Sequence, residues 1–135
     1  MTRGSIATFA AGAACLLAAA GAAGSSNSTI TRRDSKAQSN ARNMVSAVES
    51  CWAEFEDYRR CRSAAELNKG MGEFALPIGR HRGQVRVSAA RRDSYTVDSW
   101  SRSGNHFLIV KKSSGRLVRK CTTASRGLCF HNGRW

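Results

Sequence analysis

The sequence predicts an α+β protein in which one long N-terminal helix packs on a four-stranded antiparallel sheet. Two hydrophobic patterns predict this fold. Between residues 30 and 56, apolar side chains recur at steps of three and four, which is the spacing of one helical face. From residue 84 onward they recur at every second position, in four short segments separated by turn-forming residues. Of the 135 residues, 41% are hydrophobic, so residues 30–135 suffice for one small globular domain.

Residues 1–24 predict that the protein leaves the cytoplasm. A basic start is followed by an Ala-rich apolar stretch, and small residues precede Ser25, as at a signal-peptidase site. Three alternatives remain open: a cleaved secretory signal, a retained helix that anchors the protein in the cell membrane, and lipidation of Cys15. All three place the protein in the cell envelope or outside the cell. No strongly apolar run follows residue 24, which excludes a protein with several membrane spans.

The start of the long helix is expected after a short linker. Residues 25–29 are small and polar, which is typical of a flexible linker, and Thr31 and Asp34 match a capping box. The first part of the apolar face is narrow because it consists of Ala37 and Ala41, whereas the later part carries larger side chains. We therefore expect the later part to contact the core. The Ala37/Ala41 face is expected to be an assembly face that a neighbouring copy covers.

Beyond the helix, the sequence predicts a connector and a sheet. Residues 57–83 contain several glycines and the only proline, which indicates an irregular connector. Residues 84–135 are expected to form an antiparallel meander and a terminal loop, with one face of the sheet on the helix and the other in water. The expected strands are 84–89, 95–100, 106–111 and 116–122.

Four cysteines that follow Cys15 are expected to form disulfides. They are Cys51, Cys61, Cys121 and Cys129. Four cysteines allow three pairings, and we favour the two local ones, each of which would stabilise the domain by about 3 kcal/mol in the loop-entropy model. A zinc site is the rival, but neither pair has the short spacing of zinc ligands. No metal site is therefore expected.

The formal net charge is +13, and most of it lies in the predicted sheet. Residues 1–75 hold nine basic and seven acidic side chains, whereas residues 76–135 hold thirteen basic and two acidic ones. Such a positive field attracts nucleic acid, acidic cell-wall polymers or anionic lipid headgroups. The alternative is that the cations only keep an exported domain soluble. The candidate polyanion-binding residues are Arg86, Arg91, Arg92, Arg102, Lys111, Lys112, Arg116, Arg119, Lys120 and Arg126.

Little in the sequence indicates catalysis. A small secreted ribonuclease would need two histidines that face one phosphate beside a lysine, and His106, His131 and Lys120 are the best candidates. However, His106 begins an apolar strand and His131 lies in the terminal tail. The sequence contains no Gly-rich phosphate loop after a strand and no nucleophile motif. We therefore expect no catalytic residue and no cofactor-binding residue.

Several short motifs follow one another along the chain: Asn40-Ala41-Arg42-Asn43, Val48-Glu49-Ser50-Cys51, Tyr58-Arg59-Arg60-Cys61, Ser103-Gly104-Asn105, Cys121-Thr122-Thr123-Ala124, and Gly133 with Trp135 at the end. Their order and spacing, over about residues 34–135, resemble the type IV pilins and the pseudopilins of type II secretion. The resemblance implies a helix that packs into a filament core and a globular head whose terminal disulfide loop faces outward. It implies a non-enzymatic structural or minor subunit whose partners are copies of itself or other pilin-like subunits.

The N-terminus departs from the family pattern. Family members carry a Gly followed by Phe-Thr-Leu-Ile-Glu, whereas Gly4 is followed here by a different segment with Phe9 at the position of the Glu. This departure is the basis of an alternative function. In that alternative, the protein is a secreted, monomeric, cationic domain that has lost the filament helix and binds extracellular DNA or another polyanion.

Overall fold

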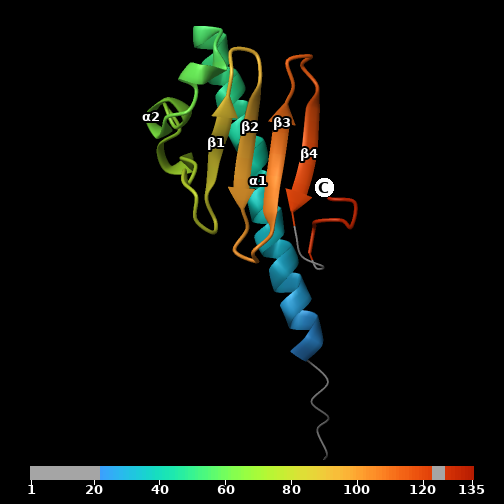
Figure 1. Cartoon of the computed structure of the whole chain (residues 1–135). Helices are drawn as coiled ribbons and strands as arrows, with labels where there is room; N and C mark the ends of the chain where they lie inside the picture. The colour runs from blue at the N-terminus through green and yellow to red at the C-terminus, as the bar shows by residue number, and fades with distance from the viewer. Residues whose placement is uncertain (1–21, 123–126) are drawn as a thin grey trace, which may run out of the picture.

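The computed structural model describes residues 22–122 and 127–135, and it has the α+β architecture that the sequence predicts. Helix α1 lies along one face of a four-stranded antiparallel sheet (Figure 1). The strand order is β1-β2-β3-β4, so each strand pairs with the next one along the chain. The elements are α1 (Ala22–Phe55), the short connector helices η1 (Tyr58–Arg60), α2 (Ala64–Leu67) and η2 (Gly72–Phe74), and the strands β1 (Val85–Ala90), β2 (Tyr95–Trp100), β3 (His106–Lys111) and β4 (Leu117–Thr122).

Helix α1 begins earlier than the sequence analysis predicts. Residues 25–29 are part of the helix and not a linker, and Asp34 lies well inside it and not in a capping box. Serine, asparagine and threonine disfavour a helix by only about 0.5 kcal/mol each relative to alanine. A helix that is already formed at residue 34 extends through such residues without a new nucleation cost.

The core lies between α1 and the sheet. The α1 side chains of Met44 and Val48 are fully buried, and they belong to the same cluster as Val85, Val97 and Ile109 of the sheet. Burial of apolar side chains of this size stabilises a fold by roughly 1.5–3 kcal/mol each. The second half of the helix therefore carries the core contact, as the sequence predicts.

The prediction that Ala37 and Ala41 form an assembly face is wrong. Their exposed fractions are 2% and 0%, because the protein's own sheet covers them. Ala37 belongs to a second buried cluster with Phe107, and the Ser99 hydroxyl donates a hydrogen bond to the Ala37 carbonyl at 2.8 Å. The small side chains allow the sheet to approach the helix backbone closely. They are therefore a docking feature inside the head.

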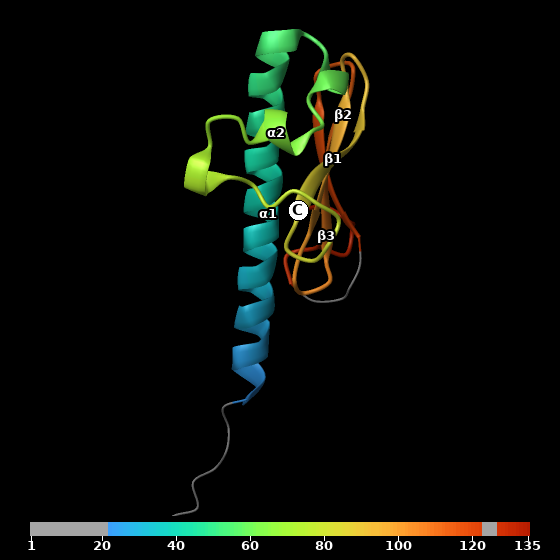
Figure 2. The same ribbon diagram turned by 90° about the vertical axis from the view of Figure 1, so that its left-hand side faces the viewer.

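The N-terminal part of α1 projects beyond the sheet (Figure 2). The helix has 34 residues, which corresponds to about 51 Å. From Asn27 to Arg33, every side chain is exposed or half-buried, and the first fully buried position is Asp34. In the described part of the chain, no helix is long and apolar enough to cross a membrane. Residues 1–21, on which most of the export prediction falls, lie outside the described residues.

Both predicted local disulfides are present. Cys51–Cys61 joins the last turns of α1 to the connector, and Cys121–Cys129 joins β4 to the C-terminal segment. That segment lies beside β4, where the Cys121 amide donates to the Gly133 carbonyl at 2.8 Å and the Trp135 indole donates to the Lys120 carbonyl at 2.8 Å. The chain end is therefore fixed to the head by one covalent bond and by backbone contacts.

Candidate functional site

A buried carboxylate organises the end of the head from which α1 projects. Asp34 is fully buried, and its oxygens accept hydrogen bonds from Ser101 Oγ at 2.6 Å and Asn105 Nδ2 at 2.7 Å. They also accept from the Ser103 hydroxyl and, at 3.0 Å, from the Leu128 backbone amide. One side chain thus joins α1, the β2–β3 turn and the C-terminal segment. This role is not predicted from the sequence, because the donors are far from Asp34 along the chain.

Gly127 lies directly over this carboxylate. Its backbone has φ +98°, and a Cβ atom at this position would lie 2.1 Å from Asp34 Oδ2. Only glycine adopts this backbone region without strain and leaves room for the carboxylate. The C-terminal segment can therefore contact Asp34 only because residue 127 lacks a side chain.

A second polar cluster lies on the C-terminal half of α1. Glu49 accepts hydrogen bonds from Tyr58 Oη and Tyr95 Oη, both at 2.8 Å, and from Lys111 Nζ at 2.8 Å. Burial raises the pKa of Glu49, but the hydrogen bonds from Lys111 and the two tyrosines lower it by more. The pKa of Glu49 therefore lies below its usual value. Lys111 also donates to Tyr58 Oη at 2.6 Å. The ammonium group of Lys111 is therefore engaged by Glu49 and Tyr58 within the head. This corrects the prediction that Lys111 binds a polyanion.

A third cluster lies on the face of the sheet away from α1. His106 Nε2 is 2.9 Å from Asp98 Oδ1, and the His106 ring stacks on Trp100 with 4.9 Å between centroids. Arg86 Cζ lies 5.4 Å from the centre of the Trp100 ring. Burial of Asp98 raises its pKa, but its hydrogen bonds and the charges of His106 and Arg86 lower the pKa below the usual value. The candidate histidines are thus in different settings, since His131 is exposed in the C-terminal segment.

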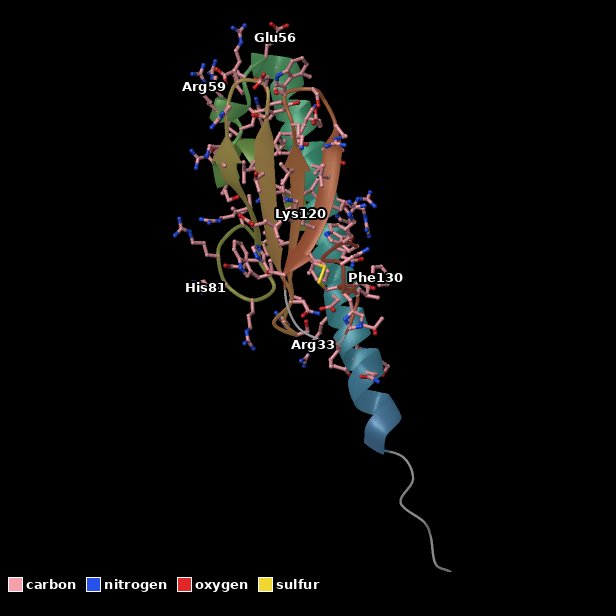
Figure 3. All side chains as sticks on the ribbon, turned by 45° about the vertical axis from the view of Figure 1, so that its right-hand side comes forward. Arg33, Glu56, Arg59, His81, Lys120 and Phe130 are labelled. Atoms are coloured by element: carbon pink, nitrogen blue, oxygen red, sulfur yellow. A yellow bond between two sulfur atoms is a disulfide. The ribbon has the colours of Figure 1, made fainter. Side chains whose placement is uncertain are left out.

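The predicted polyanion-binding residues do not form one surface. Arg86 and Lys120 lie on the sheet face away from α1, with Lys120 on the edge strand β4 (Figure 3). Arg119 is held 5.3 Å from the ring of Trp135. Arg91 and Arg92 are in the β1–β2 turn, Lys112 and Arg116 are in the β3–β4 turn, Arg102 is in the β2–β3 turn, and Arg126 lies outside the described residues.

The acidic residues are unevenly distributed along the long axis of the head, whereas cations occur at both ends. Figure 3 shows Glu56 and Arg59 at one end, and Arg33 and His81 toward the other. Two of the nine acidic residues, Asp34 and Asp98, are buried and engaged as described above. The other seven lie on the C-terminal half of α1, on the connector or in the β1–β2 turn: Glu49, Glu54, Glu56, Asp57, Glu66, Glu73 and Asp93. No acidic residue is therefore available at the end from which α1 projects.

A basic groove lies at that end, between α1 and the β2–β3 turn, with a volume of about 630 Å³. Its four cations are Arg32, Arg33 and Lys36 from α1 and Arg102 from the turn. We call this cavity the basic groove and these four residues its cations. Of these four cations, only Arg102 is predicted from the sequence. The other three lie in residues 1–75, where basic and acidic side chains are nearly balanced in number. The remaining lining residues are Ala37, Asn40, Pro77, Gly83, Trp100 and Ser101.

Comparison of the chain with protein-family models, curated proteins and solved structures gives no significant match.

Proposed function

We propose that the protein is a non-enzymatic, pilin-like subunit of the cell envelope. In this role, α1 contacts neighbouring subunits and the sheet forms an outward head. The projection of α1 beyond its own sheet is the observation that supports the proposal (Figures 1 and 2). Residues 22–33 extend for about 18 Å at the rise of an α-helix, and the buried core begins only at Asp34.

The composition of this projecting segment also supports assembly. It is rich in serine and threonine, which are weak helix formers. Because it continues a formed helix, this segment needs no new nucleation, but it has no core packing in its own head to hold it against fraying. Contact with helices of neighbouring subunits would supply that packing, and small side chains allow helices to approach closely.

The proposed contact differs from the one expected from the sequence. Since Ala37 and Ala41 are buried in the head, the surface left for assembly is the exposed side of residues 27–31. A type IV pilus and a type II secretion pseudopilus are both assemblies of this kind. The two local disulfides are consistent with a head that works in an oxidising compartment.

Cysteine cross-linking of the full chain in its host envelope tests this proposal. Asn27→Cys and Thr31→Cys place thiols at exposed positions of the projecting segment, whereas Ser113→Cys places one at the opposite end of the head, in the β3–β4 turn. We expect mild oxidation to give covalent dimers and larger species with the first two variants. Ser113→Cys should remain monomeric. If all three variants remain monomeric, the chain does not assemble through α1.

A further inference from the structure

We propose that the basic groove binds the phosphodiester backbone of a nucleic acid strand, independently of base sequence. This site goes beyond the assembly role and does not depend on it. The groove lies on the side of α1 that meets the β2–β3 turn, and its four cations come from two segments far apart in the chain.

The cations of the groove have no carboxylate to neutralise them. In the described residues, the ion pairs join Asp57 to Arg59, Glu54 to Lys69, Glu49 to Lys111 and Asp98 to His106. Asp34 is adjacent in sequence to Arg33, but its oxygens are taken by donors from the turn and the C-terminal segment. Like charges are thus held together around a concave surface, which favours an anionic ligand.

The walls of the groove are fixed before any ligand binds. The β2–β3 turn is held to α1 because Ser101 and Asn105 both donate to Asp34. Arg102 packs over Gly83, with its Nε atom 3.0 Å from where a Gly83 Cβ would lie, and Asn40 Nδ2 donates to the Gly83 carbonyl at 3.4 Å. Such preorganisation lowers the entropic cost of binding.

The chemistry of the groove favours phosphodiesters. Three of its four cations are arginines, whose planar guanidinium groups bind phosphate through two parallel hydrogen bonds. The exposed residues Arg80 and Arg82 precede Gly83 and extend the positive surface along the loop. A strand of nucleic acid presents phosphates at a regular spacing, so it can contact both the groove and this extension.

A bilayer fits the groove less well. Surfaces that bind the bilayer interface carry apolar side chains that insert among the cations. Among the described residues, the large apolar side chains that are exposed are Trp52, Phe74, Leu117 and Phe130, and none of them lines the groove. Trp100 does line it, but its ring already stacks on His106 and contacts Arg86. We therefore expect binding through charge, with no base stacking on Trp100.

The test is fluorescence anisotropy with a labelled 20-nucleotide single-stranded DNA and the full chain. Because the net charge of +13 attracts any polyanion, the experiment needs variants that lose equal charge at different places. The groove variant is Arg32→Gln/Arg33→Gln/Lys36→Gln. The matched control, Arg91→Gln/Arg92→Gln/Lys112→Gln, removes three cations from the two turns at the opposite end. All six residues are exposed, so both variants should fold, which circular dichroism checks.

We expect the groove variant to lose at least tenfold in affinity at about 100 mM salt, and the control to lose less than threefold. For a single strand, each neutralised phosphate contributes about −0.7 to the slope of log affinity against log salt. The groove variant should therefore reduce the magnitude of the slope by about 2, since it removes three contacts. Equal losses in both variants would show that binding follows net charge and would overturn the proposal. Groove-dependent binding to phosphatidylglycerol vesicles without binding to DNA would overturn it as well, in favour of lipid headgroups.

Discussion

At the scale of the residue, Asp34 joins three segments of the head. A buried carboxylate loses its hydration and is costly unless hydrogen bonds replace it. Asp34 receives them from Ser101, Ser103, Asn105 and the Leu128 amide, so three segments of the chain meet at one side chain. The same contacts position Arg102 beside α1. This residue therefore links the stability of the head to the geometry of the basic groove.

Asp34→Asn should destabilise the protein by about 2–4 kcal/mol, because the new amide group would face hydrogen-bond donors and leave some of them unsatisfied. The measurement is urea unfolding with the disulfides intact. The control is Ser35→Ala, at an exposed neighbouring position of α1, which should change the free energy of unfolding by no more than about 0.5 kcal/mol. Equal midpoints for wild type and Asp34→Asn would contradict the role assigned to the carboxylate.

Gly127→Ala should destabilise the head more than Gly115→Ala does. Both glycines have positive φ, +98° and +82°, so each substitution costs about 1 kcal/mol of backbone strain. Nothing lies within 4 Å of a Cβ at Gly115, whereas a Cβ at Gly127 would collide with Asp34. We expect thermal unfolding to separate the two variants, with the lower Tm for Gly127→Ala. Indistinguishable Tm values would mean that the C-terminal segment does not contact Asp34 in solution.

The Glu49 cluster predicts a pH dependence. The pKa of Glu49 is lower in the folded protein than its ordinary value of 4.5, so its stabilising effect is full above that value and is lost as the pH falls through the folded pKa. Glu49 is partly exposed, so solvent screening limits the effect to about 1 kcal/mol. The free-energy difference between wild type and Glu49→Gln, from urea unfolding, should shrink between pH 7 and pH 3. If the free-energy difference between the two proteins stays constant from pH 7 to pH 3, ionisation of Glu49 is not the source of that difference.

At the scale of the element, α1 serves two purposes along its length. From Asp34 to Cys51 it carries the buried residues of the head, and before Asp34 it leaves the sheet. The division follows from the side chains. Ala37 and Ala41 admit the sheet at close range, and Met44 and Val48 fill the core beyond them.

Hydrogen exchange should reveal this division in the monomeric protein. Amides at residues 27–33 are expected to exchange at least about 100-fold faster than those at residues 41–51, because the side chains of residues 27–33 are exposed or half-buried outside the core. In envelope assemblies, the same amides should become protected. Uniform protection of α1 in the monomer would show that its projecting segment needs no partner.

The sequence predicts the strands and the disulfides well because their signals are local. The two-residue period specifies the faces of β1 to β4, and the short cysteine spacings favour the pairs that form. The start of α1 is missed because the polar residues 25–29 resemble a linker, although they only weakly oppose a helix.

The misassigned sites depend on contacts between distant segments. The burial of Ala37 and Ala41 depends on Ser99 and Phe107 of the sheet, which no helical pattern reveals. The basic groove likewise combines three cations of α1 with one of the β2–β3 turn. A count of charges along the sequence points to the sheet and therefore misses the three cations on α1. Local periodicity therefore predicts the elements of this protein but not the surfaces that they form together.

At the scale of the whole molecule, two properties coincide at one end. The helix projects there, and the four cations of the basic groove lie there, whereas most acidic residues lie toward the other end. The proposed subunit contact and the basic groove therefore lie at the same end of the head.

The most direct test of the assembly role is to find where the mature chain resides and where it begins. Intact mass and N-terminal sequencing should be measured on the protein recovered from both the envelope and the medium of its host. The account predicts a chain that is held in the envelope and keeps the whole of α1, with a start at or before Ser5. A chain that starts near Ser25 and is found as a monomer in the medium would contradict it.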